Sequence, residues 1–234
     1  MVKMQKMVVL TGAGISAESG LKTFRDADGL WEGHKVEDVA TPEAWRRNPA
    51  LVLDFYNQRR AQLKKAHPNE AHTTLAKLEE QFNITIITQN VDDLHERGGS
   101  KKIMHLHGEL FKVRSTSVPD LIYEWKEDLT PKDKCEMGSQ LRPHIVWFGE
   151  EVPLMEKAAQ ECLDANYCII VGTSMQVYPA AALIRYLPLD CKLFYIDPNP
   201  TISYELGSRK NLELIKLKAT EGVKSLVAKL LNKD

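Results

Sequence analysis

The chain has 234 residues, of which 43% are hydrophobic and 27% charged, so it can bury a full core and we expect no extensive disorder. Its formal net charge of −1 argues against a nucleic-acid binder that works by bulk positive charge. No apolar run is long enough to span a bilayer, and the first residues do not resemble a signal peptide, so we expect no membrane contact.

The four cysteines are scattered and form no CxxC pair; they are Cys135, Cys162, Cys168 and Cys191. Unpaired cysteines in or beside apolar runs are typical of buried free thiols in a reducing compartment. We therefore expect a cytoplasmic protein, and we expect it to be a monomer.

Short apolar runs alternate with helical patterns along the chain, which is typical of α/β proteins with a Rossmann-like, doubly wound parallel sheet. The predicted strands cover residues 7–10, 84–88, 145–148, 167–171, 192–196 and 212–217. The predicted helices cover residues 49–63, 70–81, 154–165 and 223–231, the first with Asn48 as its N-cap and Pro49 at its first position.

Two stretches interrupt this alternation. Residues 21–81 are loop and helix, although a plain dinucleotide-binding unit would reach its second strand about 20 residues after its glycines. Residues 111–142 are irregular as well. We expect one domain over 1–234, with a Rossmann-like part at about 1–33, 84–110 and 143–234. The interruptions, about 34–83 and 111–142, would pack as a small module, and the ligand would bind in the cleft between the two parts.

A glycine-rich segment follows the first predicted strand, and Gly12-x-Gly14-x-x-Ala17 fits a dinucleotide-binding fingerprint. Gly12 would allow a tight turn, Gly14 would let the backbone approach a pyrophosphate, and Ala17 would let a helix pack closely on the strand. The phosphates would then face that helix's N-terminus. An ordinary strand-to-helix turn would look the same. No acidic residue ends a nearby second strand, which argues against a hydride-transferring dehydrogenase.

Polar side chains follow the predicted strand 84–88, where the carboxyl end of a parallel strand faces the ligand crevice. Gln89, Asn90 and Asp92 offer amide and carboxylate groups suited to ribose hydroxyls and a carboxamide. The alternative is an Asn/Asp-rich turn that caps the next helix.

Two histidines follow in His105-Leu106-His107, and in an extended segment they share one face. A metal site would use both and could add His95, but no third ligand stands at a fixed spacing. A structural histidine or a general base with a pKa near neutral are the other interpretations.

Three further strand ends carry small or polar residues: Gly172-Thr173-Ser174, the turn Asp197-Pro198-Asn199-Pro200, and Lys218-Ala219-Thr220. Such groups suit ribose or phosphate contacts, whereas a helix cap would account equally well for the first of them.

Taken together, GAGxSxxSGxxxFR with a following GLW, TQNxDxLH, HGxL and RPxxVxFGE resemble the motifs of the sirtuin family, and they occur in the family's order from Val8 to about Ala219. The resemblance implies an NAD-dependent protein-lysine deacylase that consumes NAD and binds its acylated substrate as an extended strand. Its products would be free lysine, nicotinamide and 2′-O-acyl-ADP-ribose. The turn at 196–200 is a looser match.

The resemblance assigns roles to individual residues. His107 would act as general base on a ribose hydroxyl, with Asn90 and Asp92 also catalytic. The peptide would lie along Val146, Trp147, Phe148 and Gly149, opposite a loop that contains Val177. NAD would contact Gly12, Ala13, Gly14, Glu18, Thr23, Phe24, Arg25, Trp31, Gln89, Asn90, Val91, Asp92, Gly172, Thr173, Ser174, Pro198, Asn199, Pro200 and Ala219.

The helix 49–63 carries Arg59 within its apolar stripe, and a buried arginine requires an anion. Tyr56 lies three residues earlier on the same face, so the two could bind a carboxylate together. An internal salt bridge or a snorkelling arginine would also fit. The Tyr-x-x-Arg pair resembles that of the class III sirtuins, which remove succinyl and malonyl groups, and Ala40 and Ala44 would leave room for a longer acyl chain. We expect both activities, with deacetylation retained.

The chain departs from the family in one respect. Sirtuins usually carry two CxxC pairs between HGxL and RPxxVxFG that hold a structural zinc, but residues 110–142 contain only Cys135. One thiolate cannot form a tetrahedral zinc site, so we expect no zinc and a module held by packing and hydrogen bonds. The alternatives to deacylation are ADP-ribosyl transfer or NAD hydrolysis on the same fold, and a non-catalytic NAD-sensing module.

Overall fold

The computed structural model describes residues 4–22 and 30–231. Its centre is a six-stranded sheet in the order β11-β10-β9-β1-β4-β5, in which every neighbouring pair is parallel. The strands are β1 (Gln5–Thr11), β4 (Phe82–Thr88), β5 (Ile103–His105), β9 (Tyr167–Val171), β10 (Lys192–Ile196) and β11 (Leu212–Ile215). The predicted α/β class and parallel sheet are therefore confirmed.

Helices cover both faces of this sheet because alternate residues of each strand point to opposite sides. In β1, Met7 and Val9 pack with the helices α4 (Glu70–Lys77) and α8 (Ala219–Leu231), while Val8 and Leu10 pack on the other face. That second face is covered by α6 (Met155–Cys162) and the 3-10 helix η4 (Ala180–Tyr186), and α7 (Tyr204–Gly207) lies nearby. No helix within residues 4–22 and 30–231 is both long and apolar enough to cross a membrane.

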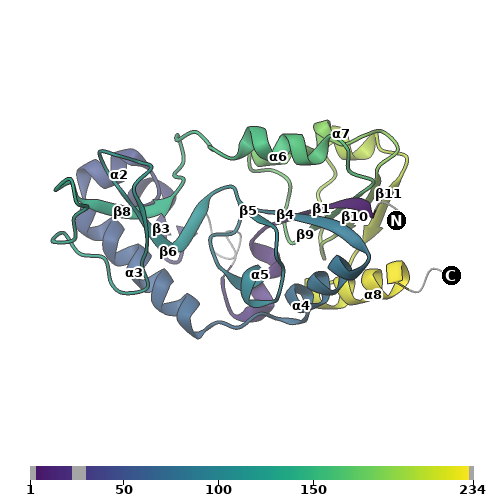
Figure 1. Ribbon diagram of the computed structural model, residues 1–234, viewed down its shortest axis with the longest axis horizontal. Coiled ribbons are helices and arrows are strands. Elements are labelled where there is room, and N and C mark those ends of the chain that lie inside the picture. The colour runs from purple at the N-terminus through teal and green to yellow at the C-terminus, as the bar shows by residue number, and fades with distance from the viewer. Residues whose placement is uncertain (1–3, 23–29, 232–234) are drawn as a thin grey trace.

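A separate group of elements lies at one end of the molecule (Figure 1). It comprises β2 (Leu30–Trp31), β3 (His34–Lys35), α1 (Val36–Val39), α2 (Pro42–Arg47) and α3 (Pro49–Lys65), together with the antiparallel sheet β7-β6-β8. That sheet is formed by β6 (Gly108–Ser115), β7 (Ile122–Glu124) and β8 (Leu141–Ile145). Two hydrophobic clusters join these helices to this sheet, and we call the group the small module.

The predicted strand 145–148 is wrong in its extent and its sheet. Ile145 ends β8, which is an edge strand of the small sheet and contains Pro143, a residue that an edge strand tolerates. Trp147 lies beyond the end of β8 and is buried between Trp45 and Tyr56 of the small-module helices and Arg142 of β8. An apolar run of four residues gives no periodicity that separates these two cases.

The helix α3 begins as predicted, because the Asn48 side chain accepts a hydrogen bond from the Leu51 amide and Pro49 occupies the first turn. The predicted helix 70–81 is shorter as an α-helix and continues as the 3-10 turn η3 (Leu78–Glu80). The strands β9 and β10 have the predicted bounds.

Candidate active site

The carboxyl ends of β1, β4 and β9 meet at one edge of the large sheet, and the loops that follow them are bonded together. The Gly12 amide donates to the Val171 carbonyl at 3.2 Å, and the Gly14 amide donates to the Gly172 carbonyl at 2.8 Å. The Gln89 amide donates to the Thr11 carbonyl at 2.9 Å. Three of the predicted site segments thus form one surface at the end of the sheet where open parallel sheets bind ligands.

The glycines of this surface allow two loops to touch backbone to backbone. A Cβ on Gly14 would lie 2.7 Å from the Gly172 Cα, and a Cβ on Gly172 would lie 2.2 Å from the Ile15 nitrogen. Gly172 also has a φ of +64°, a conformation that disfavours other residues. Side chains at these positions would separate the loops.

The expected α-helix after the glycines is absent from residues 12–20. Two 3-10 turns stand there instead, η1 (Ala13–Ile15) and η2 (Ala17–Ser19), and Ala17 is exposed rather than packed on a strand. Asn69 holds this segment: its amide nitrogen donates to the Ile15 carbonyl at 2.7 Å and to the Ser19 hydroxyl at 3.0 Å. These local bonds account for a loop that does not continue as a helix.

Ser16 joins the two predicted catalytic residues Asn90 and Asp92. Its hydroxyl donates to Asp92 Oδ2 at 3.0 Å and accepts from Asn90 Nδ2 at 3.2 Å. Asp92 also accepts from the Leu94 amide at 3.1 Å. Burial disfavours the charged form and raises the pKa of Asp92 to about 6. These hydrogen bonds fix the buried Asn90 and Asp92 side chains at the edge of the sheet.

His107 is held in one tautomer at the rim of this cluster. Its Nδ1 lies 3.1 Å from the Gln89 carbonyl, which can only accept, so Nδ1 carries the proton and Nε2 keeps its lone pair. Burial lowers the pKa of His107, and the bond to Gln89 opposes that shift. A neutral imidazole with a free, basic Nε2 is what a general base requires.

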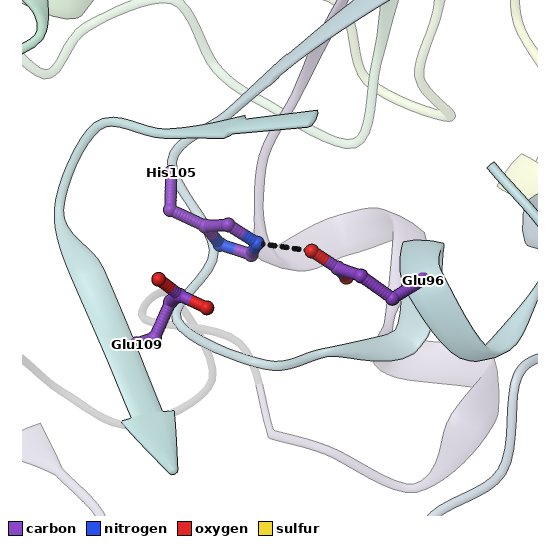
Figure 2. A group of neighbouring side chains, drawn as sticks. All are labelled: Glu96, His105 and Glu109. Atoms are coloured by element: carbon purple, nitrogen blue, oxygen red, sulfur yellow. Dashed lines mark hydrogen bonds and ion pairs between the residues drawn. The ribbon is translucent and has the colours of Figure 1, made fainter. Parts of the chain in front are cut away.

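His105 makes a different set of contacts (Figure 2). Its Nε2 lies 2.7 Å from Glu96 Oε1 and its Nδ1 lies 3.0 Å from the Asn90 carbonyl. Burial opposes the charged ring, but the hydrogen bond to Glu96 raises the pKa of His105. Both nitrogens thus donate, and the bond from Nδ1 holds the Asn90 carbonyl in place.

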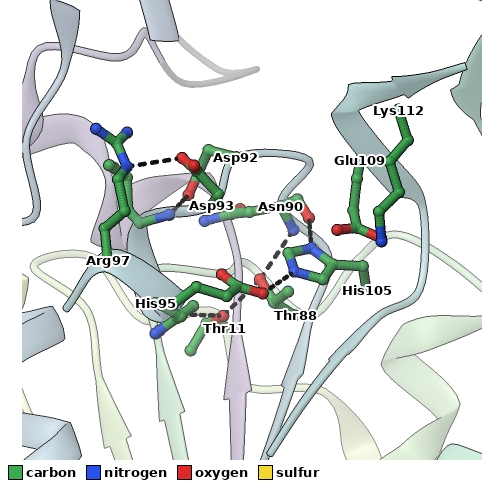
Figure 3. A network of polar contacts seen from close by, with 12 residues as sticks. Thr11, Thr88, Asn90, Asp92, Asp93, His95, Arg97, His105, Glu109 and Lys112 are labelled. Atoms are coloured by element: carbon green, nitrogen blue, oxygen red, sulfur yellow. Dashed lines mark hydrogen bonds and ion pairs between the residues drawn. The ribbon is translucent and has the colours of Figure 1, made fainter. Parts of the chain in front are cut away.

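A metal site of His95, His105 and His107, the alternative that the sequence left open, does not form among the described residues. Among the described residues, the metal-competent side chains that gather closely are Glu96, His105 and Glu109, and Glu109 already pairs with Lys112 at 2.8 Å. His95 instead bonds through Nε2 to the Thr11 hydroxyl at 3.0 Å (Figure 3). Burial keeps the pKa of His95 well below its usual value, so its ring is neutral and structural.

The remaining predicted cofactor residues lie around the same edge. The Gln89 side-chain amide nitrogen, Nε2, donates to the Thr173 hydroxyl at 3.0 Å, which ties the β4 and β9 ends together. Ser174 is half-buried beside them, and Pro198, Asn199 and Pro200 follow β10 with Pro198 and Asn199 exposed. Thr23, Phe24 and Arg25 lie outside the described residues.

Glu18 and Ala219 meet at the start of α8. The Glu18 carboxylate accepts from the Thr220 amide at 3.0 Å and from the Thr220 hydroxyl at 2.9 Å, so it caps the helix that Ala219 begins. A helix cap explains this carboxylate without a ligand.

The aromatic cluster of the small module surrounds Tyr56 and Arg59 on α3. Tyr56 is fully buried, and its oxygen accepts a hydrogen bond from the Trp147 indole at 3.0 Å. Trp31 packs edge-on against it, with ring centroids 6.3 Å apart. Burial raises the pKa of Tyr56 well above its usual value, so the phenol keeps its proton. Ala40 and Ala44 belong to the same cluster.

Arg59 is 8% exposed and incompletely bonded. Its Nε donates to Gln62 Oε1 at 3.1 Å, its Nη2 lies 3.9 Å from Glu32 Oε2, and its Nη1 is buried without a partner among the described residues. Burial lowers the pKa of Arg59, and the Glu32 carboxylate opposes that shift. The guanidinium therefore has unused capacity to bind an anion.

The segment predicted to bind the peptide follows β8. The amide of Val146 donates to the His107 carbonyl at 2.9 Å, and the amide of Phe148 donates to the Ala40 carbonyl at 3.0 Å. Phe148 is exposed, Gly149 has a φ of +89°, and Val177 lies half-buried in the loop between β9 and η4. Any peptide strand laid here would have to use the carbonyl groups of this segment more than its amides.

Hydroxyl and thiol groups converge in the small module where the sequence lacks zinc cysteines. Cys135 Sγ lies 3.3 Å from the Ser115 hydroxyl, Ser115 lies 3.3 Å from the Ser117 hydroxyl, and Ser117 donates to Ser139 at 2.5 Å. One thiol and three neutral hydroxyls do not fit Zn²⁺, which prefers thiolates and imidazoles. The donor set disagrees with a structural zinc.

Two surface hollows lie away from this edge. One is lined by small-module residues that include Trp45, Leu53 and Gln140, and the other lies beside the start of β4, around Phe82 and Asn83. Neither hollow includes His107. The ligand cleft between the two parts of the chain stays a prediction.

Sequence reasoning did not single out four residues that organise the site: Ser16, Asn69, Glu32 and Glu150. Ser16 belonged to the glycine motif, and Asn69 stands as an N-cap before α4, so each had a local signal. Glu150 ends the RPxxVxFGE motif but was given no role, although it lies only three residues from the Trp147 amide that it binds. Glu32 belongs to no motif, and only the fold brings it to Arg59.

Comparisons with known proteins agree on one family. Residues 12–179 match the Sir2 family. An NAD-dependent protein deacylase of Helicobacter pylori is 53% identical over 228 residues, which cover 97% of this chain and 98% of that protein. One of Bacteroides thetaiotaomicron is 50% identical over 230 residues, covering 95% and 97%.

Solved structures show the same fold. A mutant Sir2 homologue in complex with ADP-ribose has a TM-score of 0.88 at 38% identity, with 99% of this chain and 96% of that chain covered. A Sir2 homologue in complex with NAD has a TM-score of 0.86 at 39% identity, with 98% and 90% covered.

Proposed function

Because the chain belongs to the Sir2 (sirtuin) family, we propose that it is an NAD-dependent protein-lysine deacylase in which His107 is the general base. The observation that carries this proposal is the His107 imidazole, whose Nδ1 proton is held by the Gln89 carbonyl and whose Nε2 is left basic. It stands at the sheet edge beside the Ser16–Asn90–Asp92 cluster.

The residues at this edge suit NAD. The contact of Gly12 and Gly14 with Gly172 leaves no room for a Cβ, so small backbone loops face the ligand side, and Gln89 and Asn90 supply amide groups for ribose hydroxyls. When bound, NAD supplies the ADP-ribosyl group that accepts the acyl group and releases nicotinamide. The chain's own part is to hold that co-substrate and to remove a proton from a ribose hydroxyl through His107 Nε2.

Mass spectrometry of the products tests this proposal. Purified protein is incubated with NAD and an acetyl-lysine or succinyl-lysine peptide, and the expected products are free lysine peptide, nicotinamide and O-acyl-ADP-ribose in equal amounts. His107→Ala is the control that should give none of them. With NAD labelled in its ADP-ribose, label on the protein, or nicotinamide released without loss of the acyl group, would point to ADP-ribosyl transfer or NAD hydrolysis instead.

We also propose that the enzyme accepts succinyl and malonyl groups and retains deacetylation. The support is Arg59, a guanidinium more than nine-tenths buried whose Nη1 has no partner within residues 4–22 and 30–231, next to the protonated hydroxyl of Tyr56 on the same helix face. A carboxylate on the acyl chain would satisfy donors that are costly to bury unpaired.

Kinetics on matched peptides test the acyl preference. Tyr56→Phe with Arg59→Met should lower kcat/KM for a succinyl-lysine peptide by about 100-fold or more, because two hydrogen bonds to a charged group are lost. The acetyl-lysine peptide should change far less. Arg46→Met, at an exposed arginine of the small module, controls for loss of one positive charge. Intact succinyl turnover in the double variant would end the proposal. The cytoplasmic location and the monomeric state stay predictions.

A further inference from the structure

The hydroxyl of Tyr56 has a defined hydrogen-bond direction. Trp147 is 2% exposed, and its indole Nε1 lies 3.0 Å from the fully buried Tyr56 oxygen. An indole nitrogen can only donate, so the Tyr56 oxygen is the acceptor. The phenolic proton is therefore excluded from this bond and has to point to another partner.

The indole that imposes this direction is itself fixed on several sides. The Trp147 amide donates to Glu150 Oε2 at 2.8 Å. The Arg142 guanidinium lies 3.2 Å from the centroid of the indole ring, and it is bonded to Glu150 Oε1 at 2.6 Å and to the Ile145 carbonyl at 3.0 Å. Rotation of the indole would break its stacking on Arg142, and the bonds of Glu150 to the Trp147 backbone and to Arg142 hold both partners of that stack in place. The indole N–H is therefore a preorganised donor.

We propose that Trp147 is a positioning residue for acyl selectivity: its indole N–H occupies the Tyr56 oxygen and thereby presents the Tyr56 proton to an acyl carboxylate held by Arg59. This inference rests on the proposed function. A hydroxyl that accepts one hydrogen bond becomes a stronger donor in the next, so Trp147 strengthens the contact as well as orienting it. The role belongs to the buried side chain, distinct from the backbone of the same segment that would face a peptide.

The hydrogen bond donated by the Trp147 indole and the packing of the same indole have different consequences for selectivity. Trp147 also fills space beside Trp45, with ring centroids 5.8 Å apart, and a purely structural side chain would affect all substrates alike. Donation by the indole, in contrast, acts through one oxygen and matters most when the acyl group carries a carboxylate. Its loss should therefore change the ratio of succinyl to acetyl kcat/KM, and it should do so only while Tyr56 has its hydroxyl.

A double-mutant cycle tests this. Trp147→Phe, Tyr56→Phe and the double variant are assayed with succinyl-lysine, acetyl-lysine and the uncharged succinamoyl-lysine peptide. Trp147→Phe should lower the succinyl-to-acetyl ratio about 3- to 10-fold, with succinamoyl affected less, and the double variant should match Tyr56→Phe alone. An undiminished effect of Trp147→Phe in the Tyr56→Phe background, or no effect on the ratio, overturns the proposal.

A second substitution covers the case in which Trp147→Phe does not fold. Site-specific benzothienylalanine at position 147 keeps the bicyclic shape and lacks the N–H, and it should give the same loss of ratio; an unchanged ratio would refute the role of the N–H. Failure of the proposed acyl preference is distinguishable, because then Tyr56→Phe and Arg59→Met would themselves leave succinyl turnover intact. If those two lower it and the position-147 variants do not, only this inference fails.

Discussion

The fully buried carboxyl of Asp92 gives a prediction in which function and stability oppose each other. Burial raises the pKa of Asp92 from 3.8 to about 6. The native state thus holds this proton more tightly than the unfolded chain, so the stability contributed by Asp92 is lost as pH rises from about 4 to about 6. At about 1.4 kcal/mol per pKa unit, the ionised group costs the native state about 3 kcal/mol at pH 8 and roughly half of that at pH 5.

Asp92→Asn removes the titration and keeps the shape. The Asn side chain can still accept from the Leu94 amide through its oxygen. The altered contact with Ser16 changes the free energy of unfolding by an amount that does not depend on pH. The free energy of unfolding of the variant, minus that of the parent, should therefore grow by about 1 to 2 kcal/mol between pH 5 and pH 8. Turnover should fall at the same time, because Ser16 loses its ionic acceptor.

Urea unfolding followed by tryptophan fluorescence at pH 5, 6, 7 and 8 measures this difference. Any pH-independent change in packing cancels, because only the slope with pH is interpreted. Asp54→Asn, which removes an exposed carboxylate from α3, controls for loss of one negative charge. A difference between Asp92→Asn and the parent that is constant from pH 5 to pH 8, or that shrinks as pH rises, would refute the reasoning.

Three further changes have expected outcomes. His107→Ala should abolish deacylation while NAD affinity, measured by calorimetry, stays within about threefold of the parent, and full activity of the variant would assign the base elsewhere. Because burial lowers the pKa of His107, kcat/KM of the parent should fall on the acid side only below about pH 6.5. Glu32→Gln should lower KM for succinyl peptides about two- to fivefold by freeing Arg59, with the acetyl peptide as control, and an unchanged succinyl KM would contradict this. Gly172→Ala should cost more than about 3 kcal/mol in urea unfolding, whereas Gly20→Ala, also at positive φ but with open space, should cost about 1 kcal/mol; equal costs would contradict the steric argument.

The sequence predicted the large sheet well because its central strands are buried on both faces. The strands β9 and β10 are continuous apolar runs bounded by polar residues, and such runs indicate parallel strands directly. The three-residue strand β5 was not predicted, because too few residues carry a pattern. The run at 145–148 has the same composition as a buried strand, and only the packing of Trp147 in the small module distinguishes it.

The sequence predicted which segments form the candidate site, but it did not predict the hydrogen bonds that join them. Strand ends of a parallel sheet share an edge, so Gln89 and Thr173 could be expected to lie near each other. The bond between Ser16 and Asp92 joins residues 76 positions apart, and no local rule gives that pairing. The predicted helix after the glycines failed because Asn69, 54 positions from Ile15, holds the loop in 3-10 turns.

Arg59 shows how a conflict in a sequence pattern can be interpreted with the structure. A charged residue in an apolar stripe requires an anion, and both a protein carboxylate and a substrate carboxylate satisfy that requirement. Arg142 of the same module forms a tight pair with Glu150 at 2.6 Å, so the fold can build a close, partly buried salt bridge. Arg59 has Glu32 only at 3.9 Å and one nitrogen without a partner among the described residues. The loose pairing of this guanidinium beside Tyr56 supports the proposal that its anion is the carboxylate of an acyl group.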